Sequence, residues 1–215
     1  TQTLTFNNTG NITVNTAVTV GIYAQDGSQF SHTGSGKKIT AGAGAVGIYA
    51  IDSGTKGTVS SEIQVNGSTS DKTGIGVYSD GNSVTTFNSG AKLTLGPKTV
   101  GFYSANPDKL KDTFVVNGLE TSLDDGAVLV YAGAGTNLAG TKEVLQNITV
   151  TRMGNNSSIL YGDENSKLKL DTDIPITTKY SNLSDSAQFL VMNKGTAEII
   201  SGKTITSNLK TTISG

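Results

Sequence analysis

The sequence lacks cysteine and tryptophan altogether and contains only 3 prolines among its 215 residues. Without cysteine the chain can form neither a disulfide nor a thiolate metal site. It contains no apolar run of about 20 residues that could span a bilayer as a helix, and no signal peptide opens it. Since Thr1 already lies in a strand-like segment, we expect these residues to be a piece of a longer protein.

Charged residues of either sign are scarce. The 16 Lys and Arg residues nearly balance the 17 Asp and Glu residues, which gives a formal net charge of −1. Arg152 is the single arginine. We therefore expect no nucleic-acid partner and no membrane insertion by these residues. Because β-branched residues recur in ordered blocks and the net charge is near zero, the composition is not that of a disordered chain.

A short block containing tyrosine returns along the sequence with a period of about 27 residues. Four copies are strong: VGIYA at 20–24, VGIYA at 46–50, IGVYS at 75–79 and VGFYS at 100–104. Two weaker copies, VLVYA at 128–132 and SILYG at 158–162, keep the tyrosine and lose the glycine. A last copy, QFLV at 188–191, keeps only the apolar character.

Each repeat contains two more short strands. One precedes the tyrosine block, as in Ile12–Val14, one follows it, as in Phe114–Val116, and turn pairs such as Asp26-Gly27 separate them. Such a unit cannot bury its own apolar face, but stacked units pair equivalent strands and enclose a common core. The sequence therefore predicts an all-β fold, a right-handed parallel β-helix over residues 1–215, with three strands and about 27 residues per coil and seven to eight coils. A β-propeller would need larger blades, and helical repeats would need apolar residues at helical spacing.

Alternation within the block predicts which side chains enter the core. Val20, Ile22 and Ala24 share one face of the strand, whereas Gly21 and Tyr23 share the other. With the aliphatic face inward, the tyrosines form an outward ladder, and the glycine column leaves room for their rings. The opposite phase stays open, because interior glycines could make space for interior tyrosines.

The Gly-Ile-Tyr-Ala blocks, Asp/Ser-Gly turns and Ile-Thr-Val strands resemble the passenger-domain repeats of large autotransporter (type V secreted) adhesins, particularly those of fusobacterial outer membranes. The resemblance is strongest from Ile12 to Ser104 and lies in the style of the repeat. It implies a β-helical passenger at the bacterial cell surface, held in the outer membrane through a C-terminal barrel outside these residues, or secreted. It also implies a role in virulence through adhesion to a host cell-surface receptor or glycan, or to partner bacteria.

Patterns that could indicate a cofactor or catalysis lack their structural context. The segment GAGAVG at 42–47 matches a dinucleotide fingerprint, but a strand follows it instead of a helix. His32 is the only histidine; it lies in a polar stretch without a nucleophile elbow, so we expect it in a solvated loop. The acidic pairs at 124–125, 163–164 and 171/173 are expected at exposed corners, with a structural calcium as the alternative. We expect no cofactor, no metal site and no catalytic residue.

Two features are candidates for a binding surface. The first is the tyrosine ladder, which could stabilise coil stacking or offer a platform to sugars or a protein. Its members are Tyr23, Tyr49, Tyr78, Tyr103, Tyr131 and Tyr161. The second is a distinctive corner that carries Asn106, Asp108, Lys109 and Lys111, and the segment 133–146 is expected to contain a helical turn.

Together these patterns favour a monomeric, non-catalytic segment of an adhesin. A purely structural stalk is one alternative. A β-helical polysaccharide-active enzyme is the other, and it is disfavoured because no column of carboxylates recurs on one face.

Overall fold

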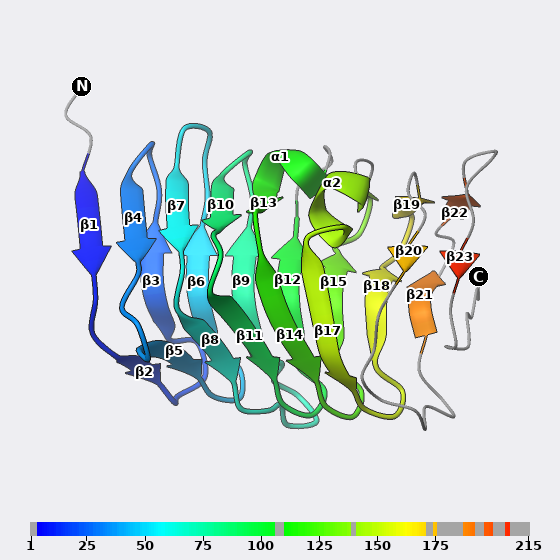
Figure 1. Ribbon diagram of the computed structural model, residues 1–215, viewed down its shortest axis with the longest axis horizontal. Helices are drawn as coiled ribbons and strands as arrows, with labels where there is room; N and C mark the ends of the chain where they lie inside the picture. The colour runs from blue at the N-terminus through cyan, green and yellow to red at the C-terminus, as the bar shows by residue number, and fades with distance from the viewer. Residues whose placement is uncertain are drawn as a thin grey trace.

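The computed structural model describes residues 4–105, 110–138, 141–170, 174–175, 187–191, 196–199 and 205–206. Three parallel sheets wind into a β-solenoid of about 5 turns with roughly 28 residues per turn (Figure 1). The parallel β-helix predicted from the repeat is therefore confirmed. The number of coils is slightly lower than the seven to eight expected.

Each of the three main sheets takes one strand from each of several successive coils, so neighbouring strands in a sheet are three strands apart along the chain. Sheet A contains β1 (Thr5–Asn8), β4 (Gln29–His32), β7 (Lys56–Val59), β10 (Val84–Phe87) and β13 (Phe114–Val116). Sheet B contains β2 (Ile12–Val14), β5 (Lys38–Ala41), β8 (Glu62–Val65), β11 (Ala91–Leu95), β14 (Leu119–Leu123) and β17 (Ile148–Met153). Sheet C contains β3 (Val20–Ala24), β6 (Val46–Ala50), β9 (Ile75–Ser79), β12 (Val100–Ser104), β15 (Val128–Ala132), β18 (Ser158–Gly162) and β21 (Ala187–Val191).

Smaller elements complete the described part of the chain. A three-stranded sheet contains β16 (Asn137–Leu138), β19 (Lys167–Leu170) and β22 (Thr196–Ile199), and a two-stranded sheet contains β20 (Ile174–Pro175) and β23 (Ile205–Thr206). Helix α1 (Leu110–Thr113) precedes β13, and α2 (Thr141–Leu145) packs against α1 and β13 (Figure 1). The helical turn predicted within 133–146 is confirmed by α2, whereas α1 has no counterpart in the sequence pattern.

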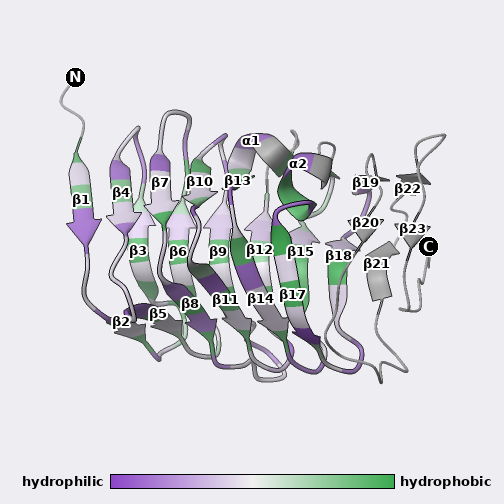
Figure 2. Cartoon of the chain, viewed as in Figure 1, coloured by the Kyte–Doolittle hydropathy of each residue, from purple (hydrophilic) through white to green (hydrophobic). Residues whose placement is uncertain are grey.

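Equivalent residues of successive coils lie side by side, so the core is built from columns. In sheet B, Ile39 pairs with Ile63, which pairs with Leu93, and all three side chains are fully buried. The alternation of hydrophobic and hydrophilic residues along the strands is visible in Figure 2. Each coil therefore buries its apolar side chains against the coil above and the coil below.

Three phenylalanines form an aromatic stack inside this core. The ring centroids of Phe87 and Phe102 are 5.0 Å apart, and those of Phe102 and Phe114 are 4.7 Å apart. All three side chains are fully buried. Phe102 occupies the position that Val77 and Val130 hold in the neighbouring coils, so this level of the core is filled by a larger side chain.

The glycines of the tyrosine block face the core. A Cβ atom built on Gly21 would lie 2.6 Å from the carbonyl oxygen of Gly47 and 3.2 Å from Cγ2 of Ile39, which belongs to the opposite sheet. The pairing of β3 with β6 joins the residues on either side and skips the two glycines. The glycine and the aliphatic residue after it thus both point inward, and the simple alternation is broken at the same position in each strand while the register stays constant.

The inward glycines correct part of the prediction of which side chains in the tyrosine block face the core. Ile22 and Ala24 are buried and Tyr23 is exposed, as expected. Val20, in the edge strand β3, is only partly buried and lies outside the continuous core. The prediction that Gly21 shares the outer face with Tyr23 is wrong, because a Cβ atom on Gly21 would point toward Ile39 in the core.

Candidate functional site

The six predicted tyrosines form one continuous ladder on the outer face of sheet C. Each ring stacks on the next, with centroid separations of 5.4, 4.5, 5.1, 4.9 and 4.7 Å from Tyr23 to Tyr161. The angles between successive ring planes are 17° or less. The ladder arises because parallel in-register pairing places identical residues at the strand spacing.

Stacking determines what the ladder can bind. Both faces of each inner ring are covered by neighbouring rings, so a sugar cannot stack on them. Tyr23, at the N-terminal end of the ladder, has a neighbouring ring on one face only and is 55% exposed. The inner rings offer only their edges and hydroxyl groups to a partner.

Carboxylate and amide groups lie at the hydroxyl side of the ladder. The Tyr131 hydroxyl donates a hydrogen bond of 2.8 Å to Oδ2 of Asp163, and the Tyr23 hydroxyl donates one of 2.6 Å to Oε1 of Gln25. Burial raises the pKa of Tyr131, and the hydrogen bond to Asp163 adds to this shift. Burial likewise raises the pKa of Tyr103 and of Tyr161, with repulsion from Asp163 as a smaller cause.

The raised tyrosine pKa values predict a loss of stability in alkali. Burial, followed by repulsion from Tyr49 and Asp80, raises the pKa of Tyr78 from 10.0 to about 12. A group whose pKa is higher in the folded state stabilises the fold below its unfolded pKa, and this contribution is lost as the pH rises through the folded pKa. We therefore expect the free energy of unfolding to fall between pH 10 and about pH 12. Urea denaturation across this range, with tyrosinate absorbance recorded in parallel, measures the effect.

The matched variant for this experiment is Tyr78→Phe, which keeps the stacked ring and removes the ionising hydroxyl. It should lose less stability over the same range. A free energy of unfolding that stays constant to pH 12 would show that the pKa of Tyr78 is not raised in the folded protein.

The second predicted surface cannot be located in the same detail. Asn106, Asp108 and Lys109 lie outside the described residues, and Lys111 falls within α1, with its side chain also outside the description. The distinctive corner therefore stays a prediction.

His32 is in the core, not in a solvated loop as predicted. It is the last residue of β4 and is 0% exposed. Its Nε2 lies 2.8 Å from the carbonyl oxygen of Gly10, which can only accept, so Nε2 carries the proton. Nδ1 then accepts a hydrogen bond from the Ser61 hydroxyl. The polar ring is buried because both nitrogens have partners, and it joins three successive coils.

Buried hydroxyls at corners that follow sheet C strands are a feature that the sequence reading missed; these corners lead to sheet A in the early coils and to the β16–β19 sheet in the later ones. Thr55, Ser83, Thr136 and Ser166 are all buried where the chain enters the next coil. The Ser83 hydroxyl donates to the carbonyl oxygen of Ala50 at 2.8 Å, which satisfies a polar atom inside the solenoid. The sequence contains a signal for these hydroxyls, because a serine or threonine lies five or six residues after Tyr49, Tyr78, Tyr131 and Tyr161.

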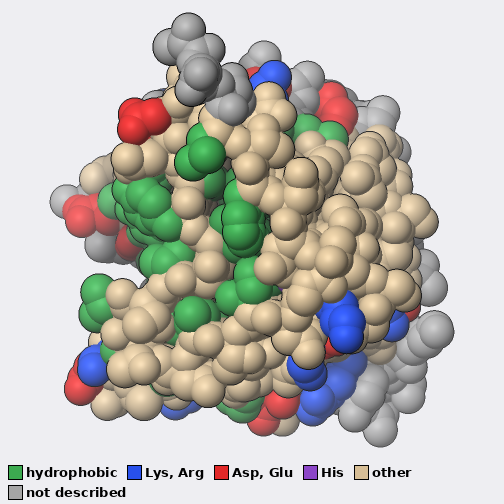
Figure 3. All heavy atoms as spheres, turned by 90° about the vertical axis from the view of Figure 1, so that its left-hand side faces the viewer, with side chains coloured by type: hydrophobic (Ala, Val, Ile, Leu, Met, Phe, Trp, Pro, Cys, Tyr) green, Lys and Arg blue, Asp and Glu red, His purple; other side chains and the backbone are tan. Residues whose placement is uncertain are grey.

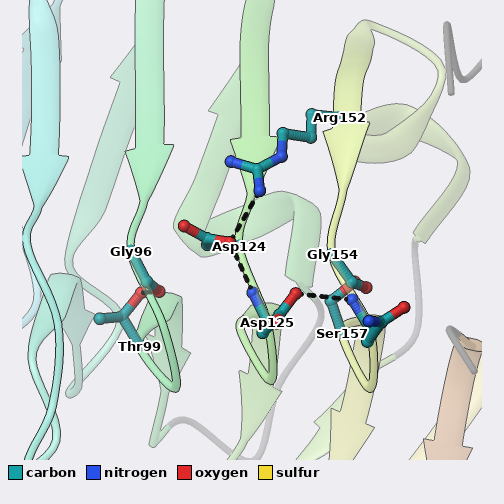
Figure 4. Close-up of polar contacts among 8 residues, drawn as sticks. Gly96, Thr99, Asp124, Asp125, Arg152, Gly154 and Ser157 are labelled. Carbon is teal, nitrogen blue, oxygen red and sulfur yellow. Dashed lines mark hydrogen bonds and ion pairs between the residues drawn. The ribbon is translucent and has the colours of Figure 1, made fainter.

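The acidic pair at 124–125 belongs to the corner between sheets B and C (Figure 4). Oδ1 of Asp124 lies 2.9 Å from Nη2 of Arg152, and Oδ1 of Asp125 accepts a hydrogen bond of 2.9 Å from the backbone amide of Asn155. These carboxylates therefore fasten one coil to the next. At the equivalent corner of the preceding coil, the Thr99 hydroxyl donates a hydrogen bond of 2.8 Å to the carbonyl oxygen of Gly96, which closes the turn within its own coil.

The remaining predictions concern a dinucleotide-like segment, metal sites and membrane-spanning helices. The segment after the dinucleotide-like glycines is strand β6, as expected from the repeat. Within the described ranges, no group of three or more His, Asp or Glu side chains could hold a metal ion, and residues 171–173 lie outside those ranges. The part of the chain that is described contains no helix long and apolar enough to cross a membrane.

The N-terminal end of the solenoid exposes apolar side chains (Figure 3). Leu4, Phe6 and Tyr23 are exposed here, around a hollow of about 230 Å³ that also contacts Phe30. The hollow forms because β1 and β3 are the edge strands of their sheets at this end.

Comparison with known proteins gives no assignment. No family model, no curated protein and no solved structure matches the chain.

Proposed function

We propose that the chain is a non-catalytic segment of a bacterial cell-surface autotransporter adhesin. In this role it is a stiff rod that displays adhesive surfaces to host cells or to other bacteria. The observation that carries the proposal is the unbroken tyrosine ladder along sheet C, together with the glycine-tyrosine repeat that resembles adhesin passengers.

The ladder supports a rod because bending the solenoid would separate or compress the stacked rings. Each aromatic pair contributes about 0.5 to 1.5 kcal/mol beyond the area that it buries. Five successive pairs lie along one face, and the core columns run parallel to them. A rigid scaffold of this kind leaves its corners free to vary, and binding residues often lie on such loops.

A purely structural stalk is the second candidate. It is favoured by the coverage of the inner ring faces, which directs the aromatic area of the ladder toward coil stacking. A stalk of this kind would bind no ligand by itself.

The test is binding of the purified 215-residue protein to host cells and to partner bacteria, with a glycan array in parallel. An adhesive segment should bind saturably. If the ladder is the contact, the double variant Tyr78→Ser, Tyr103→Ser should lose binding while circular dichroism shows the same β content. Val115→Ser, which removes a partly buried side chain from sheet A, is the matched control.

The outcomes separate the candidates. Binding that survives the tyrosine variants would place the contact on a corner. A folded protein that binds no cell and no glycan would contradict the adhesive role and leave the stalk.

A further inference from the structure

A polar groove crosses three coils at the corner between sheets A and B. The corner from β4 to β5 spans residues 33–37, whereas the next one, from β7 to β8, consists of residues 60–61 alone. The long corner rises beside the short one and leaves a groove of about 580 Å³. Its polar side chains include Ser35, Lys37, Ser60, Glu62, Ser89 and Lys92.

The floor of the groove is held in place from inside the solenoid. Ser61 is 4% exposed, and its hydroxyl turns inward to His32, whose other ring nitrogen bonds to Gly10. The short corner is therefore fastened to the two preceding coils. A ligand would meet a surface that needs little ordering on binding.

The groove walls carry Lys37, Lys92 and Glu62, and only Lys37 among these lysines lacks an ion pair within the described residues. Lys92 pairs in register with Glu62, but its Nζ leans to Oε1 of Glu120 at 3.5 Å. Both partners of that ion pair are about half exposed, so it contributes little and can be exchanged. Lys37 is exposed and forms no ion pair with any described residue. The Lys37 ammonium therefore faces the groove beside the Glu62 carboxylate, and Lys92 can add a second ammonium by exchanging its exposed contact with Glu120 for one with a ligand.

The lining also defines the polarity of the occupant. All of the lining side chains are hydroxyl-bearing or charged, apart from two glycines, so the groove has no aromatic or aliphatic side chain to hold an aromatic or lipid ligand. The Glu62 carboxylate accepts a hydrogen bond of 2.9 Å from Thr94, which fixes it as an acceptor. Serine hydroxyls and a fixed carboxylate match the hydroxyls of a sugar, and the ammonium group of Lys37, joined by the exchangeable one of Lys92, matches a carboxylate.

We propose that this groove binds a carboxylated saccharide. Lys37 and Lys92 contact the sugar carboxylate, and Glu62 and the serine hydroxyls contact the sugar hydroxyls. The inference deepens the proposed adhesive function and rests on it for its biological meaning, but the binding is a property of the groove and is measured separately.

The test uses a glucuronate-containing tetrasaccharide as the probe, titrated into the isotope-labelled 215-residue protein and followed by amide NMR shifts. The shifts should cluster at 33–37, 60–62 and 89–92. The same tetrasaccharide with its carboxylates methyl-esterified should bind about tenfold more weakly, because it loses a charge-assisted hydrogen bond. Lys37→Gln should weaken binding of the acidic probe by a similar factor, whereas Lys56→Gln, at an exposed lysine that does not line the groove, should leave it unchanged.

Each contrary result overturns the proposal. These are no shift at millimolar probe, shifts centred on other residues, equal affinity for the ester, or full affinity in a folded Lys37→Gln protein. If the protein binds cells but not the saccharide, the groove assignment fails and the adhesive role stands. If it binds the saccharide but no cell, the groove assignment stands and the adhesive role fails.

Discussion

Replacement of Phe102 by alanine should lower the free energy of unfolding by about 4 kcal/mol, since truncation of a buried phenylalanine usually costs 3 to 5 kcal/mol. Phe102 is the middle ring of the interior stack and touches Phe87 and Phe114 at centroid distances of 5.0 and 4.7 Å. Its removal leaves a cavity between two coils that also share backbone pairing in sheet C, so the site cannot collapse freely. Urea denaturation followed by circular dichroism measures the loss.

Two further variants test whether the loss of stability comes from the buried volume of Phe102. Phe102→Leu keeps most of the volume and should cost less than about 1.5 kcal/mol. Phe6→Ala removes a ring that is 46% exposed at the N-terminal end and should change stability little. Equal losses for Phe102→Ala and Phe6→Ala would show that the aromatic stack does not hold the core together.

The second large effect is expected from the addition of one methyl group at Gly76. A Cβ atom there would lie 2.7 Å from the carbonyl oxygen of Gly101 and 3.2 Å from Cδ1 of Leu93. Because the oxygen belongs to the backbone of the next coil, Gly76→Ala must shift a paired strand. We expect a loss of about 3 kcal/mol, the upper part of the range for overpacked cores. The midpoint and slope of a urea transition give the value.

Gly10→Ala is the matched control for this prediction. The nearest atom to its added Cβ would be Oδ1 of Asn8 at 3.8 Å, which is ordinary contact. With no clash, the lower entropy of the unfolded chain should make this variant neutral or slightly more stable. A Gly76→Ala protein as stable as Gly10→Ala would contradict the inward orientation of the glycine column.

That orientation could have been read from the sequence, but only from its weaker repeats. Leu129 and Ile159 replace the glycine, and both side chains are buried, which would be unexpected on an outer face. Across the core, Thr121 and Val150 then stand in the sheet B column that Leu93 occupies earlier. Larger side chains in one sheet are thus offset by smaller ones in the other. Strict alternation missed this because two consecutive residues point inward.

The repeat made the tyrosine ladder and the stacked coils predictable, since identical residues at one period must pair in a solenoid. It could not predict the corner from β4 to β5. Strand β4 reads as a polar stretch because Gln29 and Ser31 face outward, and only Phe30 and His32 carry its inner face. The burial of His32 depends on partners in two other coils, and no spacing within one repeat reveals them.

The groove between sheets A and B could not be predicted from the repeat for a related reason. It exists because adjacent corners have unequal lengths, and a period averages such differences away. Its lysines are ordinary solvent-exposed residues along the chain. Lys92 joins Lys37 in lining one groove only because strand pairing places Lys92 beside Glu62.

The column of parallel strands also determines how the chain can be assembled. Every strand of the three main sheets pairs with a strand one coil away, so no contact of the sheets requires the closure of a longer loop. The entropic cost of closing a loop depends on the number of residues in it, and here that number stays near one period however many coils are added. A completed coil is a template for the next one, and nucleation at any point can spread by single steps. The polypeptide can thus fold coil by coil, in either direction along the chain, as each segment becomes free to fold. It does not need to collapse as a whole first.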